Sequence, residues 1–248
     1  MAILPGIEIN SKGVVRSDWA DYPGPFRGGN PGSTAGCAKR TKFGYFPRVN
    51  DWHEDPFPHL IGDGIACFRN PGDAHLPVWP TPALLHRPRP VGPVPGEFRT
   101  RPRFATRKAN DEAPGARLVR VSVPHGTSLY GTGEVAGPLM RNGRTTVCWN
   151  TDAFEYDDTT PRLYQSHPWV LRVRADGSAF GVLADTACRC EIRTGSAPDA
   201  AEVVSQDVVF TVPESTPPFA VYIVERDSPE QVVAALAELS RMPVDDPT

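Results

Sequence analysis

The sequence predicts a mostly β protein, an antiparallel β-sandwich with an irregular proline-rich segment before it and one helix after it. Three observations lead to this prediction. Prolines and glycines, 28 and 22 of 248 residues, are too frequent for long helices. At least six segments after residue 115 have the alternation or the β-branched composition of short strands. Turn residues separate these segments with no helical pattern between them, which favours antiparallel pairing over a parallel sheet.

The first part of the chain, residues 1–104, is expected to be irregular. Seven prolines lie between Pro77 and Pro95. Each proline removes a backbone donor and fixes φ, so this run cannot form a helix interior or a central strand. Two apolar pieces, Leu60–Ile61 and Ile65–Phe68, have the composition of brief strands, with turn residues between them. We therefore expect short strands at most in this segment.

A β-sandwich domain is expected over residues 105–227. Val119, Val121 and Val123 alternate with polar residues, which is the period of a half-buried strand. Asp176-Gly177 separates two apolar runs and readily takes the positive φ of a hairpin turn. The expected strands cover residues 119–123, 169–174, 179–183, 187–193, 203–212 and 219–225.

A helix followed by a linker is expected over residues 228–248. Ser228 can cap the helix, Pro229 suits the first helical position, and Gln231 completes a capping box. Met242-Pro243 ends it. Its apolar stripe is expected to consist of Val232, Val233, Leu236 and Leu239.

Charge and hydropathy exclude several classes of partner. The net charge of −3 and the pI near 6.1 give no basic surface for a nucleic-acid backbone or an anionic membrane. There is no apolar run long enough to span a bilayer and no secretory signal at the N-terminus. We therefore expect a cytoplasmic protein without nucleic-acid or membrane partners.

The cysteines favour reduced thiols over a disulfide framework. Five is an odd number, and their spacing is scattered. A lone Cys188-Arg189-Cys190 without nearby histidines is weak evidence for a metal site, since alternate residues of a strand simply share a face. No metal or organic cofactor is expected. The cysteines are Cys37, Cys67, Cys148, Cys188 and Cys190.

Three motifs follow one another between residues 130 and 169. They are Tyr130–Glu134 with Arg141–Gly143, then Trp149–Phe154, then Leu163–Trp169. In order and spacing these motifs resemble the N-terminal β-sandwich domain of glycoside hydrolase family 31, the family of α-glucosidases and α-xylosidases. The resemblance covers about residues 118–242 and implies a galactose-mutarotase-like sandwich.

The resemblance also implies an activity, the hydrolysis of O-glycosidic bonds in α-glucosides and related sugars. In the family, the catalytic aspartates lie in a (β/α)8 barrel that begins just after the point where this sequence ends. No catalytic residue is therefore assigned to this chain, which we expect to be inactive by itself. A separately encoded barrel domain is an implied partner, and an α-glucoside-type carbohydrate is the implied ligand.

The candidate binding residues lie in the second motif. By the resemblance, Asp152 belongs to a loop that the sandwich contributes to the rim of the active site. Asn150, Trp149 and Phe154 are its expected partners, since sugars offer hydroxyls to carboxylates and amides and apolar C–H faces to aromatic rings.

Structural interpretations of the same residues stay open. Trp149, Tyr164 and Trp169 could pack between two sheets, and Asp152 could cap a turn. A pairing of Asp152 with a nearby carboxylate would mimic a hydrolase pair, but nothing in the sequence tunes one of them as an acid. These neighbouring carboxylates are Glu134, Glu155, Asp157 and Asp158.

Two further hypotheses concern the chain as a whole. One is a non-catalytic carbohydrate-binding or partner-docking module. The other is a truncated gene product, which would expose apolar surface that normally packs against the barrel.

Overall fold

The computed structural model describes residues 7–9, 15–17, 51–77, 89–110, 114–160, 162–195 and 206–240. The chain divides into two compact units, residues 1–47 with 109–114, and residues 48–108 with 115–248. In the first unit, β1 (Ile7–Ile9) pairs antiparallel with β2 (Val15–Ser17). All other described elements belong to the second unit.

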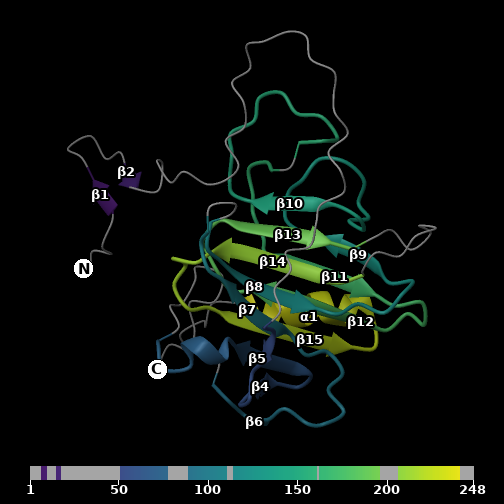
Figure 1. Ribbon diagram of the computed structural model, residues 1–248. Coiled ribbons are helices and arrows are strands. Elements are labelled where there is room, and N and C mark those ends of the chain that lie inside the picture. The colour runs from purple at the N-terminus through teal and green to yellow at the C-terminus, as the bar shows by residue number, and fades with distance from the viewer. Residues whose placement is uncertain are drawn as a thin grey trace, which may run out of the picture. The chain divides into compact units, whose positions relative to one another are not determined.

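One sheet of the second unit has six antiparallel strands in the order β10-β13-β14-β8-β7-β3 (Figure 1). Non-local pairing builds it, because residues 208–213 pair with residues 116–121 and residues 53–54 pair with residues 103–104. Its strands are β3 (His53–Glu54), β7 (Arg103–Arg107), β8 (Ala116–Val121), β10 (Thr145–Cys148), β13 (Cys190–Thr194) and β14 (Val208–Pro213).

The other sheet has seven antiparallel strands in the order β6-β4-β5-β15-β12-β11-β9. The last strand of the chain, β15, therefore lies at its centre. Its strands are β4 (His59–Gly62), β5 (Ile65–Arg69), β6 (Gly92–Pro93), β9 (Ser128–Gly131), β11 (Trp169–Val173), β12 (Ala179–Ala184) and β15 (Ala220–Arg226).

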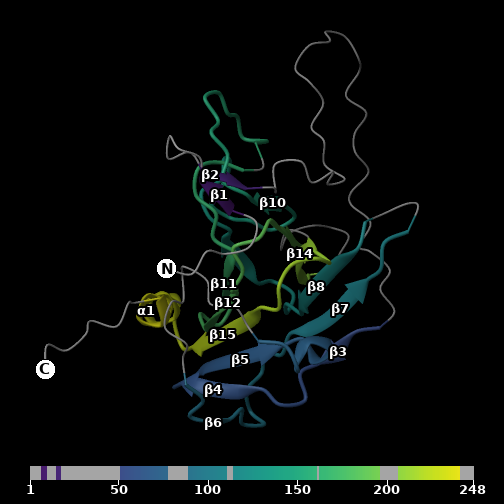
Figure 2. The same cartoon turned by 90° about the vertical axis from the view of Figure 1, so that its left-hand side faces the viewer.

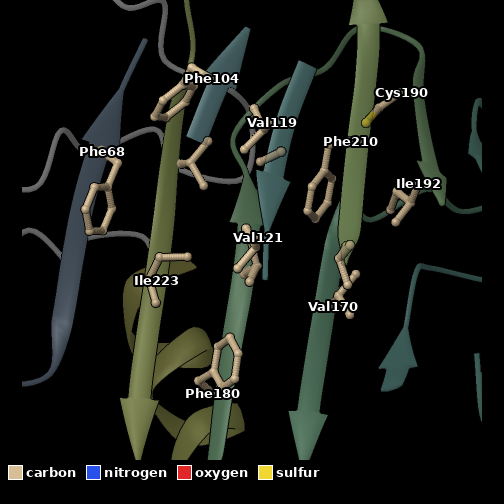
Figure 3. Close-up of a cluster of buried hydrophobic side chains, with 14 of the residues drawn as sticks. Phe68, Phe104, Val119, Val121, Val170, Phe180, Cys190, Ile192, Phe210 and Ile223 are labelled. Carbon is tan, nitrogen blue, oxygen red and sulfur yellow. The ribbon is translucent and has the colours of Figure 1, made fainter. Parts of the chain in front are cut away.

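The main core lies between the two sheets and is filled by alternate residues of facing strands (Figure 3). Phe180 and Ile223 come from the seven-stranded sheet, and Val119, Phe210 and Ile192 come from the six-stranded sheet. All are at most 1% exposed. This arrangement confirms the predicted antiparallel β-sandwich.

A second apolar cluster lies on the other face of the seven-stranded sheet, under the helix α1 (Pro229–Ser240) (Figure 2). Tyr222 and Val224 of β15 point to this face, while Val221 and Ile223 point into the sandwich. Both faces of β15 are thus buried, which explains why its sequence is a continuous apolar run.

Within this second cluster, the indole of Trp169 lies across Gly181 of the neighbouring strand. A Cβ atom added to Gly181 would meet Cη2 of the indole at 1.8 Å. Only glycine fits at this position, so the aromatic ring and the glycine form one packing unit.

The predicted hairpin is present. β11 pairs with β12, and Gly177 in the turn between them has φ +84°. The Asp176 carboxylate accepts hydrogen bonds from the N–H and the hydroxyl of Ser178, which also hold its pKa below the ordinary value.

The predicted helix is present, but one residue of its predicted stripe is wrong. Ser228 Oγ accepts a hydrogen bond from the Gln231 N–H at 3.4 Å, as expected of a cap. Val232 and Leu239 are buried, whereas Val233 is 48% exposed and Ala235 takes its place against the sheet. Positions 232, 235, 236 and 239 follow one helical face, and position 233 lies off it by about 100°.

Strands from the proline-rich part also enter the sandwich. β4 and β5 coincide with the two apolar pieces noted in the sequence, and β3, β6 and the first two residues of β7 also precede residue 105. The prolines from Pro80 to Pro88 lie outside the described residues. In the described part of the chain, no helix is both long and apolar enough to cross a membrane.

Candidate functional site

The first motif forms a backbone turn of unusual conformation at the end of β9. Gly131, Thr132 and Gly133 have φ of +94°, +71° and +85°. Thr132 is the one non-glycine residue with positive φ among the described residues, and a β-branched side chain disfavours that region. Its N–H donates to the carbonyl of Trp169 at 2.8 Å. The turn therefore fastens the first motif to the third.

Buried polar side chains hold this turn in place. The Arg141 guanidinium donates to the Thr146 hydroxyl at 3.2 Å, and that hydroxyl donates to the Thr132 hydroxyl at 3.1 Å. Arg141 also donates to the carbonyls of Ala136 and Pro138. Burial lowers the pKa of Arg141, with Arg144 adding to the effect. Tyr130–Glu134 and Arg141–Gly143 are thus a structural frame.

Asn142, which follows Arg141 in the motif, covers the free edge of β9. The Asn142 side chain accepts from the Leu129 N–H and donates to the Thr127 carbonyl, both at 2.9 Å. An exposed strand edge would otherwise leave these groups unpaired within the protein. Arg141 and Asn142 thus have structural roles. In the sequence, the only indication of these roles was their position within the first motif.

The loop from Trp149 to Tyr164 begins where β10 ends. The Thr151 N–H donates to the Leu163 carbonyl at 2.8 Å, and the Tyr164 hydroxyl donates to the Ala153 carbonyl. Both views show the chain projecting beyond the sheet edge at β10 (Figures 1 and 2). These cross-links close the loop at its base, and its tip is free to present side chains.

The candidate binding residues all have exposed side chains. Trp149 is 40% and Phe154 is 89% exposed, and Asn150 and Asp152 are also exposed. Tyr156, at 59%, adds a further aromatic ring that the sequence had not singled out. The loop therefore offers rings and carboxylates to solvent.

The interpretation of the aromatics as packing between the sheets is wrong for all three. Trp149 and Tyr164, at 40% and 43%, are exposed because they lie beyond the end of β10 and in the loop. Trp169 is buried, but against α1 and not between the sheets.

Side chains other than that of Asp152 make the hydrogen bonds of the turn in this loop. The Thr151 hydroxyl donates to the Trp149 carbonyl at 3.0 Å. Within the described residues, the Asp152 carboxylate has no hydrogen-bond partner. Its two oxygens are available to accept hydrogen bonds from a ligand.

A pocket of about 1070 Å³ lies between the loop, the end of β12 and the last turn of α1. Trp149 and Asn150 line it, together with Cys148, Asp185 and Cys188. The structure brings these two predicted residues together at the pocket, whereas Asp152 and Phe154 are not among its lining residues.

The carboxylates that could pair with Asp152 are all exposed: Glu134, Glu155, Asp157 and Asp158. Asp157 lies fully at the surface, where hydrogen bonds from the Thr159 hydroxyl and N–H and from Thr160 lower its pKa. A general acid needs a raised pKa, so Asp157 does not have that role. Across the described ranges, no three histidine, cysteine or acidic side chains are placed to hold a metal ion.

Comparison with known proteins identifies the region of the three motifs. Residues 83–192 match the family model described as the glycosyl hydrolase 31 N-terminal galactose mutarotase-like domain. A curated relative, alpha-glucosidase 2 of Bacillus thermoamyloliquefaciens, is 45% identical over 58 residues, which is 23% of this chain and 7% of the relative.

Solved structures of similar proteins include two glycoside hydrolases. A family 31 alpha-glucosidase from Bacteroides thetaiotaomicron is 46% identical, with 48% of this chain and 18% of that chain covered and a TM-score of 0.40. A GH31 dextranase from Flavobacterium johnsoniae, complexed with glucose, is 14% identical, with 78% and 21% covered and a TM-score of 0.43. This chain thus spans 7% of the curated relative's length and 18% of the first structure's.

Proposed function

Residues 83–192 match the glycosyl hydrolase 31 N-terminal galactose mutarotase-like domain, and from this premise we propose that the loop from Trp149 to Phe154 binds α-glucoside-type carbohydrate. The protein to which this domain belongs then hydrolyses O-glycosidic bonds in α-glucosides. The domain contributes to substrate binding at the rim of the site, while the bond is cleaved by residues elsewhere.

One observation carries the proposal, the exposure of aromatic rings and of the Asp152 carboxylate on a loop fastened at its base. Trp149 and Phe154 can cover the apolar C–H faces of a sugar. Asp152 and Asn150 can accept and donate hydrogen bonds to its hydroxyls. Because the loop is closed by the Thr151 to Leu163 hydrogen bond, less conformational entropy is lost on binding.

Isothermal titration with α-linked and β-linked glucose disaccharides tests the binding. We expect weak binding of the α-linked sugar, weakened at least tenfold by Trp149→Ala or Asp152→Asn, which corresponds to about 1.4 kcal/mol. Phe57→Ala is the matched control, since Phe57 is 83% exposed but precedes β4 of the seven-stranded sheet, whereas the loop follows β10 of the six-stranded sheet. Equal affinity of wild type and Trp149→Ala for the α-linked sugar would contradict the proposal.

A hydrolysis assay separates binding from catalysis. The purified chain is incubated with an aryl α-glucoside and an aryl α-xyloside, and no turnover is expected. Turnover that Asp152→Asn abolishes would contradict the assignment of the chemistry to residues elsewhere.

A second candidate function is docking to a separately encoded barrel domain. Leu139 at 80% and Met140 at 44% exposure, close to Phe154 in sequence, give apolar side chains that a partner could cover. Co-purification with a family 31 barrel expressed separately tests this candidate. It is supported if Leu139→Asp releases the barrel, and it is rejected if no complex forms.

A further inference from the structure

Two cysteines lie directly opposite each other on neighbouring strands. In the antiparallel pair of β10 and β13, Cys148 is the partner of Cys190. Both side chains belong to the core between the two sheets, so both point to the same face. Cys148 is 5% exposed and Cys190 is fully buried (Figure 3 labels Cys190). Both are free thiols.

This placement satisfies the backbone requirement of a disulfide. Opposite residues of an antiparallel pair have Cα atoms about 4.5 to 5.5 Å apart. Disulfides occur at Cα separations of about 4.4 to 6.8 Å. Two thiols on the same face of paired strands can therefore join by side-chain rotation, and the strands need not move.

One of the two cysteines lies at the pocket. Cys148 lines the pocket beside Trp149 and Asn150, whereas Cys190 does not. Cys188, two residues before Cys190, also lines the pocket and is partly exposed. The pair thus has one member at the pocket and a second directly behind it, and stepwise thiol exchange needs one attacking and one resolving thiol.

We propose that Cys148 and Cys190 are a redox modification site, oxidised to a cross-strand disulfide by a small-molecule disulfide that enters through this pocket. The Cys148 thiolate attacks one sulfur of the reagent, forms a mixed disulfide and releases one thiol. The Cys190 thiolate then attacks the Cys148 sulfur and releases the second thiol. Two protein thiols are oxidised, one disulfide reagent is reduced to two thiols, and the protons of both cysteines pass to the released thiolates.

Burial makes this reaction slow. Desolvation raises the pKa of Cys148 to about 12 and raises that of Cys190 well above the ordinary value. The thiolate is the reactive form, so the pair reacts more slowly than an exposed cysteine and faster as the pH rises.

The disulfide would change the protein next to the candidate binding loop. Cys148 is the last residue of β10, and Trp149 follows it directly. A bond to Cys190 ties the start of the loop covalently to β13, the strand next to β10. Oxidation is therefore expected to raise the melting temperature.

The experiment uses a double variant, Cys37→Ser with Cys188→Ser, which removes two thiols outside the pair. The folded protein is equilibrated with oxidised glutathione and digested, and the peptides are analysed by mass spectrometry. We expect a linked peptide that contains Cys148 and Cys190, a higher melting temperature, and reversal of both by dithiothreitol.

A third substitution in the same background, Cys190→Ala, provides the matched control. We expect glutathione to remain attached at Cys148, with no linked peptide. The proposal is overturned if the linked peptide forms only after denaturation, or if the glutathione adduct persists equally with and without Cys190. If the variant with Cys190→Ala does not fold, the presence or absence of the linked peptide in the double variant still tests the proposal.

Discussion

At the scale of single residues, the contact between Gly181 and Trp169 gives a stability prediction. Gly181→Ala should lower the free energy of unfolding by about 3 kcal/mol, because the new methyl group meets a rigid indole. Chemical denaturation measures it. Gly92→Ala is the control, since nothing lies within 4 Å of its Cβ position, and a change within about 0.5 kcal/mol is expected. Equal effects of both substitutions would contradict the packing argument.

Residue-scale features of the site were only partly predictable. The loop chemistry of Asn150 and Asp152 could be read from residue types, but the exposure of Trp149 could not. It depends on β10 ending at Cys148, one residue earlier. The hydrogen bonds of Arg141 connect groups that only the fold brings together, so no local pattern indicates them.

At the scale of elements, the attachment of α1 to the sheet can be tested. Leu239→Ala should cost about 2 to 3 kcal/mol, because Leu239 is 6% exposed in the cluster under the helix. Val233→Ala is the matched control on the same helix. Val233 is 48% exposed, and alanine has the higher helix propensity, so its effect should lie near zero. Thermal or urea unfolding measures both, and similar losses would mean that the helix face is assigned wrongly.

Whether an element could be predicted depends on how far apart in sequence its interacting residues lie. The hairpin of β11 and β12 has a local signal, the Asp176-Gly177 pair between apolar runs. β3 and β6 have two residues each and pair with partners about 30 to 50 residues away, so neither length nor pattern reveals them. The helix was found from its cap, but the exposure of Val233 depends on how α1 rotates against β15 and β12.

At the scale of the whole molecule, buried thiols give a pH dependence. Burial raises the pKa of Cys67 and Cys148 from 9.0 to about 12, and Cys190 and Tyr222 shift in the same direction. The unfolded chain loses the thiol protons near pH 9, so the stability that they contribute is complete below that pH. It is lost as the pH rises towards 12, by about 1.4 kcal/mol per pH unit for each thiol.

Urea unfolding under reducing conditions, at several pH values below and above about 9, measures this slope. Cys148→Ser should make the slope shallower by the contribution of one thiol, whatever it does to the stability at neutral pH. Phe57→Ala, which removes an exposed ring and no titrating group, should leave the slope unchanged. An unchanged slope in Cys148→Ser would contradict the prediction.

The strand order has a consequence for the moment at which the protein can fold. β14 lies between β13 and β8, and β15 lies between β5 and β12. The two strands that complete the interior of each sheet are thus the last two of the described strands. During synthesis, β5 and β12 remain without a common neighbour until residues 220–226 have left the ribosome. Until then the apolar faces of the earlier strands stay open to chaperones, and the sandwich closes in one late step when β15 arrives.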